Sequence, residues 1–296
     1  MILRSLLTAW LQNAARAKLQ ERVAEAVRDQ VQGAAAPDEA APAERPCDVG
    51  IVFALGIELG SMEDRLDGVI VTHGGGFVAR QGGLKGRHIV LLESGVGREA
   101  ARHGTEALLL GHHPKYVISA GFAGGLTEDL KRGDVVMADS LMDESGRSLA
   151  IDLKVSPESL AGTPGVHVGR ILTVDRIVHT TAEKKALGEQ HQALAVDMES
   201  LAVAEVCSRE KARFLAVRII SDAWDDQLPA DVDRLLRRKS TVGRLGAAVG
   251  AIVNRPSSVK DMLKLKEDAL VFSDRLAKFL SSMIVQLVAK PPSDAP

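Results

Sequence analysis

The chain has 296 residues, of which 46% are hydrophobic and 26% are charged, and its formal net charge at pH 7 is −2. A chain of this length and hydrophobic content can bury a substantial core as one large domain or two small ones, so we expect a soluble globular protein. The near-zero net charge excludes a global basic field that would attract nucleic acid or an anionic membrane. A small neutral or polar ligand fits this charge better.

Cys47 and Cys207 are the only cysteines of the chain. They exclude a disulfide framework and a thiolate metal cluster and indicate a reducing compartment, so we expect a cytoplasmic protein. The first seven residues faintly resemble the start of a secretory signal. Polar Gln12, Asn13 and Arg16 interrupt the apolar run before it is long enough for export or for spanning a membrane.

Apolar residues recur at helical spacing near the N-terminus, which predicts an amphipathic helix over residues 1–32. Residues 33–46 are rich in Ala, Pro and Glu, and their prolines oppose both helix and strand, so this segment is predicted to be a linker. We expect the helix to pack in a dimer or against its own chain. Contact of residues 2–32 with a membrane surface is the alternative.

The main domain is predicted over residues 47–235, where short β-branched runs alternate with helical stretches. This alternation predicts a single α/β domain with a central mixed, mostly parallel sheet flanked by helices. Ligands of such sheets gather at the carboxyl ends of the strands. The predicted strands are 49–54, 89–93, 116–120, 134–138, 170–174, 193–196 and 214–220, and the predicted helices between them are 98–110 and 198–209.

The C-terminal part is helix-rich, and residues 236–296 are predicted to form a helical extension. Helices are expected over 230–238, 242–253 and 259–288, with a break at Pro256. We expect these helices to form a packed cap on the sheet, and contact with a partner or a membrane is the alternative.

Two acidic residues come just after predicted strands. Asp222 follows the apolar run 214–220 and Ser221, which places its carboxyl group at the mouth of a buried strand. There it could protonate a purine nitrogen, but it could equally cap the next helix. Glu58 lies just beyond the strand at 49–54, where it could be a base that activates water or a solvated loop residue.

A third acidic residue, Glu199, follows the strand at 193–196 and Met198, and is predicted in the first turn of the next helix. There it could accept hydrogen bonds from two ribose hydroxyls, but a helix start by itself also favours an acid. Cleavage of an N-glycosidic bond needs an acid for the departing base, groups that grip the ribose, and delivery of water or phosphate. These three carboxylates meet those needs.

Two glycine-containing segments also follow predicted strands. The sequence Ser-Gly-Val-Gly at 94–97 precedes a predicted helix and could offer backbone donors to an anion, or serve as a plain turn. The sequence Ser-Ala-Gly-Phe-Ala-Gly-Gly-Leu at 119–126 forms a predicted loop whose glycines let the backbone approach a ligand closely.

In this order and spacing, the segments resemble the purine nucleoside phosphorylase superfamily and look most like the methylthioadenosine/S-adenosylhomocysteine nucleosidases. The resemblance covers residues 47–235, about two thirds of the chain. Its strongest pieces lie at 94–97, at 123–126 with 131–136, at 196–199 and at 217–222.

The resemblance implies that Asp222 is the acid that protonates the purine and that Glu58 is the base acting on the attacking water. Glu199 would bind ribose hydroxyls with Met198 against the sugar, Gly124 would contact the ribosyl group, and Val178 would recognise adenine through its main chain. The full set of substrate-binding residues implied is Met198, Glu199, Gly124, Ala123, Val178, Ile177, Phe122 and Ser94. The family uses no metal and no organic cofactor, and it commonly forms homodimers.

Three positions depart from the family pattern. Phe122 replaces the family's serine before Ala-Gly-Gly, which removes a hydroxyl near the acid. Ile177 replaces the phenylalanine that usually stacks on the base, so stacking becomes aliphatic contact. Residues 228–232 contain no aromatic side chain where the family closes over the 5′ substituent. These departures leave the identity of the substrate's 5′ substituent undetermined by the sequence.

The stretch 228–280 is similar to hopanoid-associated phosphorylase-like proteins, which act on an adenosyl-lipid. We expect the chain to hydrolyse the N-glycosidic bond of a 5′-modified adenine nucleoside and to release adenine. The first alternative is phosphorolysis of a purine nucleoside, and an adenosyl-lipid is one candidate substrate for it. A non-catalytic nucleoside-binding protein is the second.

Overall fold

A computed structural model of the chain describes residues 46–153, 163–228 and 256–288. The predicted N-terminal helix, nearly all of the linker, and the helices predicted over 230–238 and 242–253 lie outside the described residues. The domain limits at residues 32, 46 and 235 therefore stay predictions.

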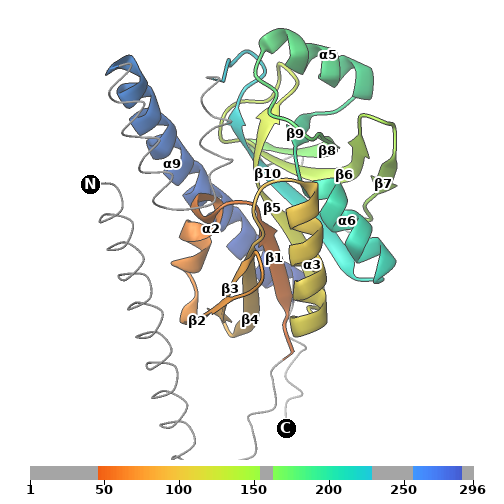
Figure 1. The fold of residues 1–296 in the computed structure, drawn as a ribbon, viewed down its shortest axis with the longest axis vertical. Coiled ribbons are helices and arrows are strands. Elements are labelled where there is room, and N and C mark those ends of the chain that lie inside the picture. Colours follow the sequence, from red (N-terminus) through yellow and green to blue (C-terminus); the bar gives the residue numbers. More distant parts are fainter. Residues whose placement is uncertain (1–45, 154–162, 229–255, 289–296) are drawn as a thin grey trace, which may run out of the picture. The chain divides into compact units, whose positions relative to one another are not determined.

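The described elements confirm the α/β fold, because each of the seven predicted strands and both helices predicted between them recur at the expected places (Figure 1). In chain order the elements are β1 Val49–Phe53, α2 Gly56–Glu63, β2 Asp67–His73, β3 Val78–Leu84, β4 Arg87–Glu93, α3 Arg98–His112, β5 Tyr116–Gly125, β6 Val135–Asp143, β7 Ser148–Ala150, β8 Val166–Thr173, α5 Thr181–His191, β9 Ala195–Asp197, α6 Ser200–Arg209, β10 Arg213–Asp222 and α9 Pro256–Leu287.

A single mixed sheet contains the described strands in the order β10-β6-β8-β9-β5-β1-β4-β3-β2, with β7 paired to β6. Because β10 also pairs with β5, the first five strands of this order close into a ring, and the other four extend from it. The pairs β1–β4, β1–β5 and β10–β5 are parallel, so their carboxyl ends meet at one edge. The antiparallel share is larger than predicted because β2, β3 and β7 were not anticipated and because the predicted strands β10 and β6, and β5 and β9, pair antiparallel.

Strand β1 shows how the sequence divides the core between the two faces of the sheet. All five of its residues are buried, and successive side chains of a strand point to opposite faces. Ile51 and Phe53 join a hydrophobic cluster with side chains of α2 and α9, whereas Val52 joins a cluster with side chains of α3 and α6. Figure 1 shows these two helix pairs covering different faces.

Helix α9 packs into the same core as the sheet. Leu276, Ala277, Leu280 and Ile284 recur at helical spacing and are buried in the larger cluster. The helix begins at Pro256, a residue favoured at the first helical position, so the predicted break falls where α9 starts. None of the described helices is long and apolar enough to cross a membrane.

Three local predictions need correction. The segment 119–125, predicted as a loop, is the second half of β5. Glu58 lies in helix α2 and not in a loop. Glu199 is the N-cap residue before α6 and not a member of its first turn.

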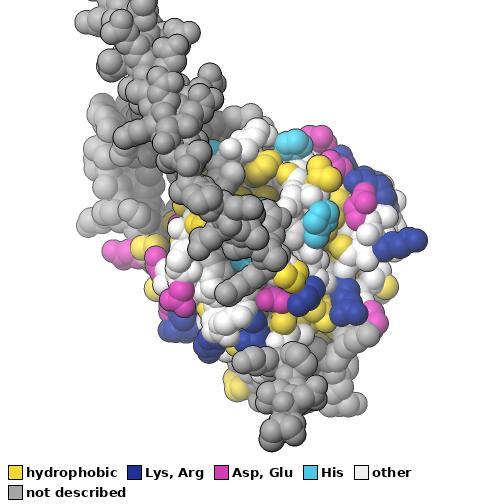
Figure 2. Space-filling view, turned by 90° about the horizontal axis from the view of Figure 1, so that it is seen from below, with side chains coloured by type: hydrophobic (Ala, Val, Ile, Leu, Met, Phe, Trp, Pro, Cys, Tyr) yellow, Lys and Arg dark blue, Asp and Glu magenta, His cyan; other side chains and the backbone are white. Residues whose placement is uncertain are grey.

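Side chains of opposite charge are interspersed over the described part of the face in Figure 2, where dark blue and magenta groups lie among apolar and polar ones. Ion pairs also join opposite charges on the described surface, such as Arg209 with Glu106 and Arg176 with Glu144.

The packing of α9 predicts unequal effects of two leucine substitutions on this helix. Leu280 is 0% exposed and Leu270 is 51% exposed. Leu280→Ala is expected to lower the free energy of unfolding in urea by about 2–5 kcal/mol, because it leaves a cavity in the core. Leu270→Ala is the matched control and should change it by less than about 0.5 kcal/mol. Equal effects would contradict a shared core.

Candidate active site

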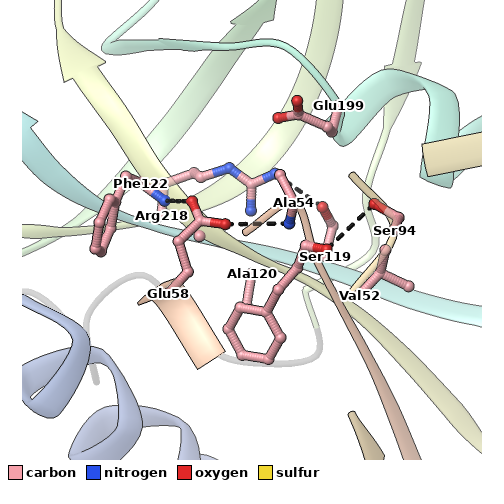
Figure 3. Close-up of a pocket in the computed structure, with 11 residues that line it drawn as sticks. Val52, Ala54, Glu58, Ser94, Ser119, Ala120, Phe122, Glu199 and Arg218 are labelled. Carbon is pink, nitrogen blue, oxygen red and sulfur yellow. Dashed lines mark hydrogen bonds between the residues drawn. The ribbon is translucent and has the colours of Figure 1, made fainter. Parts of the chain in front are cut away.

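A pocket lies at the carboxyl ends of the parallel strands β1 and β4 and beside the middle of β5 and β10. It brings together four predicted site residues, Glu58, Ser94, Phe122 and Glu199, and Figure 3 shows them around one space with Arg218. The full lining is Val52, Phe53, Ala54, Glu58, Ser94, Ser119, Ala120, Gly121, Phe122, Glu199 and Arg218.

Glu58 is buried and is held by backbone donors from two directions. Its Oε2 accepts from the N–H groups of Ala54 (3.1 Å) and Leu55 (2.8 Å), and its Oε1 accepts from the N–H of Phe122 (2.8 Å). Burial raises the pKa of Glu58 above its ordinary value, and these N–H groups and the nearby Arg218 offset only part of that rise. A carboxylate with a raised pKa is suited to accept a proton from water.

Arg218 is the positive charge of the pocket, and its guanidinium is held by three partners. Nε donates to Asp197 Oδ2 (2.8 Å), Nη2 donates to Ser119 Oγ (2.8 Å), and Nη1 donates to the carbonyl of Val217 (3.0 Å). Arg218 is 2% exposed, so its charge is compensated by a buried partner and not by water. The guanidinium favours the ionised form of both Glu58 and Glu199.

Glu199 borders the pocket from the start of α6. Its Oε1 accepts from the N–H of Gly97 (2.7 Å), the residue before α3. Burial, and next the charge of Asp197, raise the pKa of Glu199 from 4.5 to about 8, while the Gly97 N–H and Arg218 act in the opposite direction. The other carboxylate oxygen is available for a ligand hydroxyl in the pocket.

Glycines of β5 let the backbone approach two carboxyl groups. A Cβ at Gly121 would lie 2.7 Å from Glu58 Oε1, and a Cβ at Gly124 would lie 3.0 Å from Asp222 Oδ2. The two glycines are three residues apart, which along a strand is about 10 Å. Glu58 and Asp222 therefore contact β5 at two places about 10 Å apart along the strand.

Asp222 ends β10 and is 5% exposed. The pairing of β10 with β5 shifts between Ile220 and Asp222, and such a bulge redirects the side chain that follows it. Asp222 Oδ1 accepts from Ser221 Oγ (2.7 Å), and Oδ2 pairs with Lys184 Nζ (2.6 Å). The described chain after Asp222 continues as a turn, so the capping role considered from the sequence has no helix there.

Lys184 and Arg218 were missed as site residues by sequence reasoning. Lys184 is completely buried in α5, and the spacing of Lys184 with the buried residues Leu187, Gly188 and His191 would have placed it on the inner face of that helix. Arg218 stands inside the apolar run of β10, where a charge needs a buried partner.

Two of the four predicted lining residues, Ser94 and Phe122, and Ala123, which lies outside the lining, also make contacts away from the pocket. Ser94 Oγ donates to the carbonyl of Phe53 (3.2 Å) and that of Gly95 (2.9 Å). The Phe122 ring packs edge-on against Phe272 of α9, with ring centroids 6.4 Å apart. Ala123 is buried in the larger core cluster.

Several predicted residues lie outside the pocket lining: Val178 and Ile177, expected around the base, Met198 and Gly124, expected near the sugar, and the expected acid Asp222. Val178 is buried in a cluster with Leu126 and Leu187, and Ile177 is partly buried. Met198 is partly buried next to Glu199. Within the described residues, no group of His, Cys, Asp and Glu is arranged to hold a metal ion.

The family model described as the phosphorylase superfamily matches residues 48–156 and 154–254. The chain belongs to the phosphorylase superfamily. This membership confirms the family predicted from the motifs and the expectation of an enzyme.

Solved structures similar to this phosphorylase-superfamily member share its fold at low sequence identity. A Helicobacter pylori 5′-methylthioadenosine/S-adenosylhomocysteine nucleosidase is 22% identical, with a TM-score of 0.62 over 81% of this chain and 98% of that chain. The Neisseria meningitidis nucleosidase in complex with methylthio-immucillin-A is 23% identical, with a TM-score of 0.60 over 79% and 99%. The futalosine hydrolase of H. pylori is 22% identical, with a TM-score of 0.60 over 81% and 98%.

The close approach of β5 to Asp222 predicts that Gly124→Ala impairs this superfamily member without unfolding it. The added methyl group would lie 3.0 Å from Asp222 Oδ2 and push the carboxyl group aside. Displacement of a reacting group by about 1 Å can cost about 100-fold in rate, so we expect a fall of that order in kcat for nucleoside cleavage. Gly111→Ala, where a Cβ meets no atom within 4 Å, is the control. Equal rates for both variants would contradict the approach.

The raised pKa of Glu199 predicts a stability that depends on pH. Between about pH 4.5 and pH 8 the folded protein keeps a proton on Glu199 that the unfolded chain has released, so stability falls as pH rises through this window. Glu199→Gln removes this contribution, so its Tm relative to the wild type should be higher at pH 8 than at pH 5. Neighbouring Glu58, Asp197 and Arg218 are present in both proteins. Glu189→Gln, at an exposed carboxylate, is the control, and an unchanged Tm difference for Glu199→Gln would contradict the prediction.

Proposed function

We propose that the chain hydrolyses the N-glycosidic bond of a 5′-modified adenine nucleoside and releases adenine. The observation that carries this proposal is the charge of the pocket. Two carboxylates, Glu58 and Glu199, line it together with one cationic side chain, Arg218.

Arg218 is already engaged by Asp197, Ser119 and the Val217 carbonyl. A phosphate dianion in this pocket would stand beside two acidic side chains whose pKa values burial already raises, and it would disfavour their ionised forms further, whereas a water molecule can donate to a carboxyl oxygen without a charge penalty. The pocket therefore favours water as the acceptor of the sugar.

Arg98 and Arg102 of α3 are basic residues that could serve as phosphate ligands, and acidic residues engage both. Arg98 Nη1 pairs with Asp143 (3.2 Å), and its Nη2 donates to the carbonyl of Thr173 (2.8 Å). Arg102 pairs with Glu99 (2.9 Å) and Glu205 (3.7 Å). These contacts oppose their use by phosphate and support hydrolysis over phosphorolysis.

In the proposed reaction, Asp222 gives a proton to a nitrogen of the purine as the bond from that base to C1′ of the ribose breaks. The sugar then carries positive charge, which the nearby carboxylates stabilise. A water molecule adds to C1′ and passes a proton to Glu58. Glu199 accepts hydrogen bonds from ribose hydroxyls, with Met198 against the sugar.

The backbone of Gly124 and Ala123 would contact the ribosyl group, and Val178 would recognise adenine through its main chain. Similar solved structures include methylthioadenosine/S-adenosylhomocysteine nucleosidases and a futalosine hydrolase, which the family names distinguish by substrate. The assay below therefore compares nucleosides with different 5′ groups. A cytoplasmic homodimer is part of the proposal and rests on the family resemblance. Membrane contact through residues 2–32 stays a prediction.

The proposal is tested by incubating the full chain with methylthioadenosine, S-adenosylhomocysteine, adenosine, inosine and futalosine, each with and without phosphate. Free base and sugar phosphate are measured by chromatography. Base release that does not depend on phosphate is expected for at least one adenine nucleoside with a 5′ substituent. Asp222→Asn should slow it by about 100- to 10,000-fold, because general acid catalysis contributes about that much.

Asp225→Asn is the matched control, because Asp225 is exposed and lies three residues away. Formation of a sugar phosphate would overturn hydrolysis in favour of phosphorolysis. Binding of nucleosides without any turnover would leave only a binding protein.

A further inference from the structure

Lys184 is a buried cation in contact with Asp222, the proposed acid. It is 0% exposed, although lysine almost never lies fully inside a protein without a partner. Its Nζ donates to Asp222 Oδ2 (2.6 Å), to the carbonyl of Ala223 (2.6 Å) and to the carbonyl of Asp226 (3.0 Å). These three acceptors match the three protons of an ammonium group.

The two carbonyls fix the direction of the remaining Lys184 proton. They belong to the turn 223–226, in which the N–H of Ala223 donates to Asp226 Oδ2 (2.7 Å). Arg132 pairs with the same carboxylate (2.5 Å) and holds this turn from outside. With two Lys184 protons directed to carbonyls, the third points along the short contact to Asp222.

A carboxylate paired with an ammonium group has no proton of its own to give. Ser221 donates to Asp222 Oδ1 and Lys184 donates to Oδ2, so both oxygens of the proposed acid are acceptors in this arrangement. The protons in contact with Asp222 are therefore carried by Ser221 and Lys184, and of these two donors the ammonium group is the more acidic. A bound nucleoside would exclude water, which makes a buried pair of opposite charges easier to neutralise by proton transfer.

We propose that Lys184 supplies the proton that Asp222 delivers to the departing purine. As the bond to C1′ breaks, one proton moves from Lys184 Nζ to Asp222 Oδ2. In the same step one proton moves from Asp222 to a purine nitrogen. Asp222 ends as a carboxylate and Lys184 as a neutral amine, which regains its proton from water after the products leave. This role rests on the proposed N-glycosidic cleavage and makes Lys184 a positioning and proton-supplying residue.

The test compares two substrates that differ only in their need for an acid. An adenine nucleoside requires protonation of the base, whereas 4-nitrophenyl β-D-ribofuranoside has a leaving group that departs as an anion. Lys184→Met is expected to lower kcat for the adenine nucleoside by about 100-fold or more and to leave kcat for the nitrophenyl riboside close to that of the wild type. Loss of both activities in equal measure would reduce Lys184 to a structural residue.

Lys184→Arg separates charge from proton supply, because arginine keeps the positive charge but does not release its proton. The arginine variant is expected to stay impaired on the adenine nucleoside. Recovery to the wild-type rate would overturn the proposal. Lys185→Met is the matched control, because Lys185 is the next residue of α5 and its side chain is 61% exposed.

Wild-type protein provides a measurement that does not depend on a folded variant. The single-turnover rate on the adenine nucleoside, measured in mixtures of H₂O and D₂O, should follow a bowed curve because two protons move as the bond breaks. A straight line would contradict transfer from Lys184. Absence of cleavage of every nucleoside by the wild type would instead refute the proposed function itself.

Discussion

The buried ion pair between Arg218 and Asp197 is the interaction on which the site depends. Two carboxylates, Glu58 and Glu199, border one pocket, and burial alone would strongly disfavour their ionised forms. Arg218 provides the opposing charge, and its contacts with Asp197 and Ser119 join β10, β9 and β5. Removing either partner of such a pair leaves an uncompensated buried charge, so loss of the ion pair would also disrupt the pocket.

Helix α9 contacts the segment that carries Glu58 and the basic residue that pairs beside Asp222. Ser273 Oγ donates to the carbonyl of Glu58 (3.1 Å), which fixes the turn of α2 that carries the proposed base. Asp268 lies 3.5 Å from Arg132, which also pairs with Asp226 beside the proposed acid. A helix that sequence reasoning treated as an extension is therefore part of the framework that positions the chemistry.

The fold and three carboxylates could be predicted because they depend on local signals. β-branched runs marked the central strands, and the acids that follow them reach one edge because parallel strands end together. Glycines made two other elements hard to predict. Gly56 and Gly60 weaken the helical pattern of α2, and Gly82 and Gly83 weaken the strand pattern of β3. Charge pairing between distant segments, such as Lys184 with Asp222, depends on tertiary packing and has no signal at either residue alone.

The most direct test of a hydrolytic site is a crystal structure of the protein with methylthio-immucillin-A, grown in the presence of phosphate. We expect ribosyl hydroxyls within hydrogen-bonding distance of Glu199, the base analogue beside Asp222, and a water molecule on Glu58. A phosphate ion between Arg218 and the sugar analogue would contradict this expectation, as would an analogue bound away from these carboxylates.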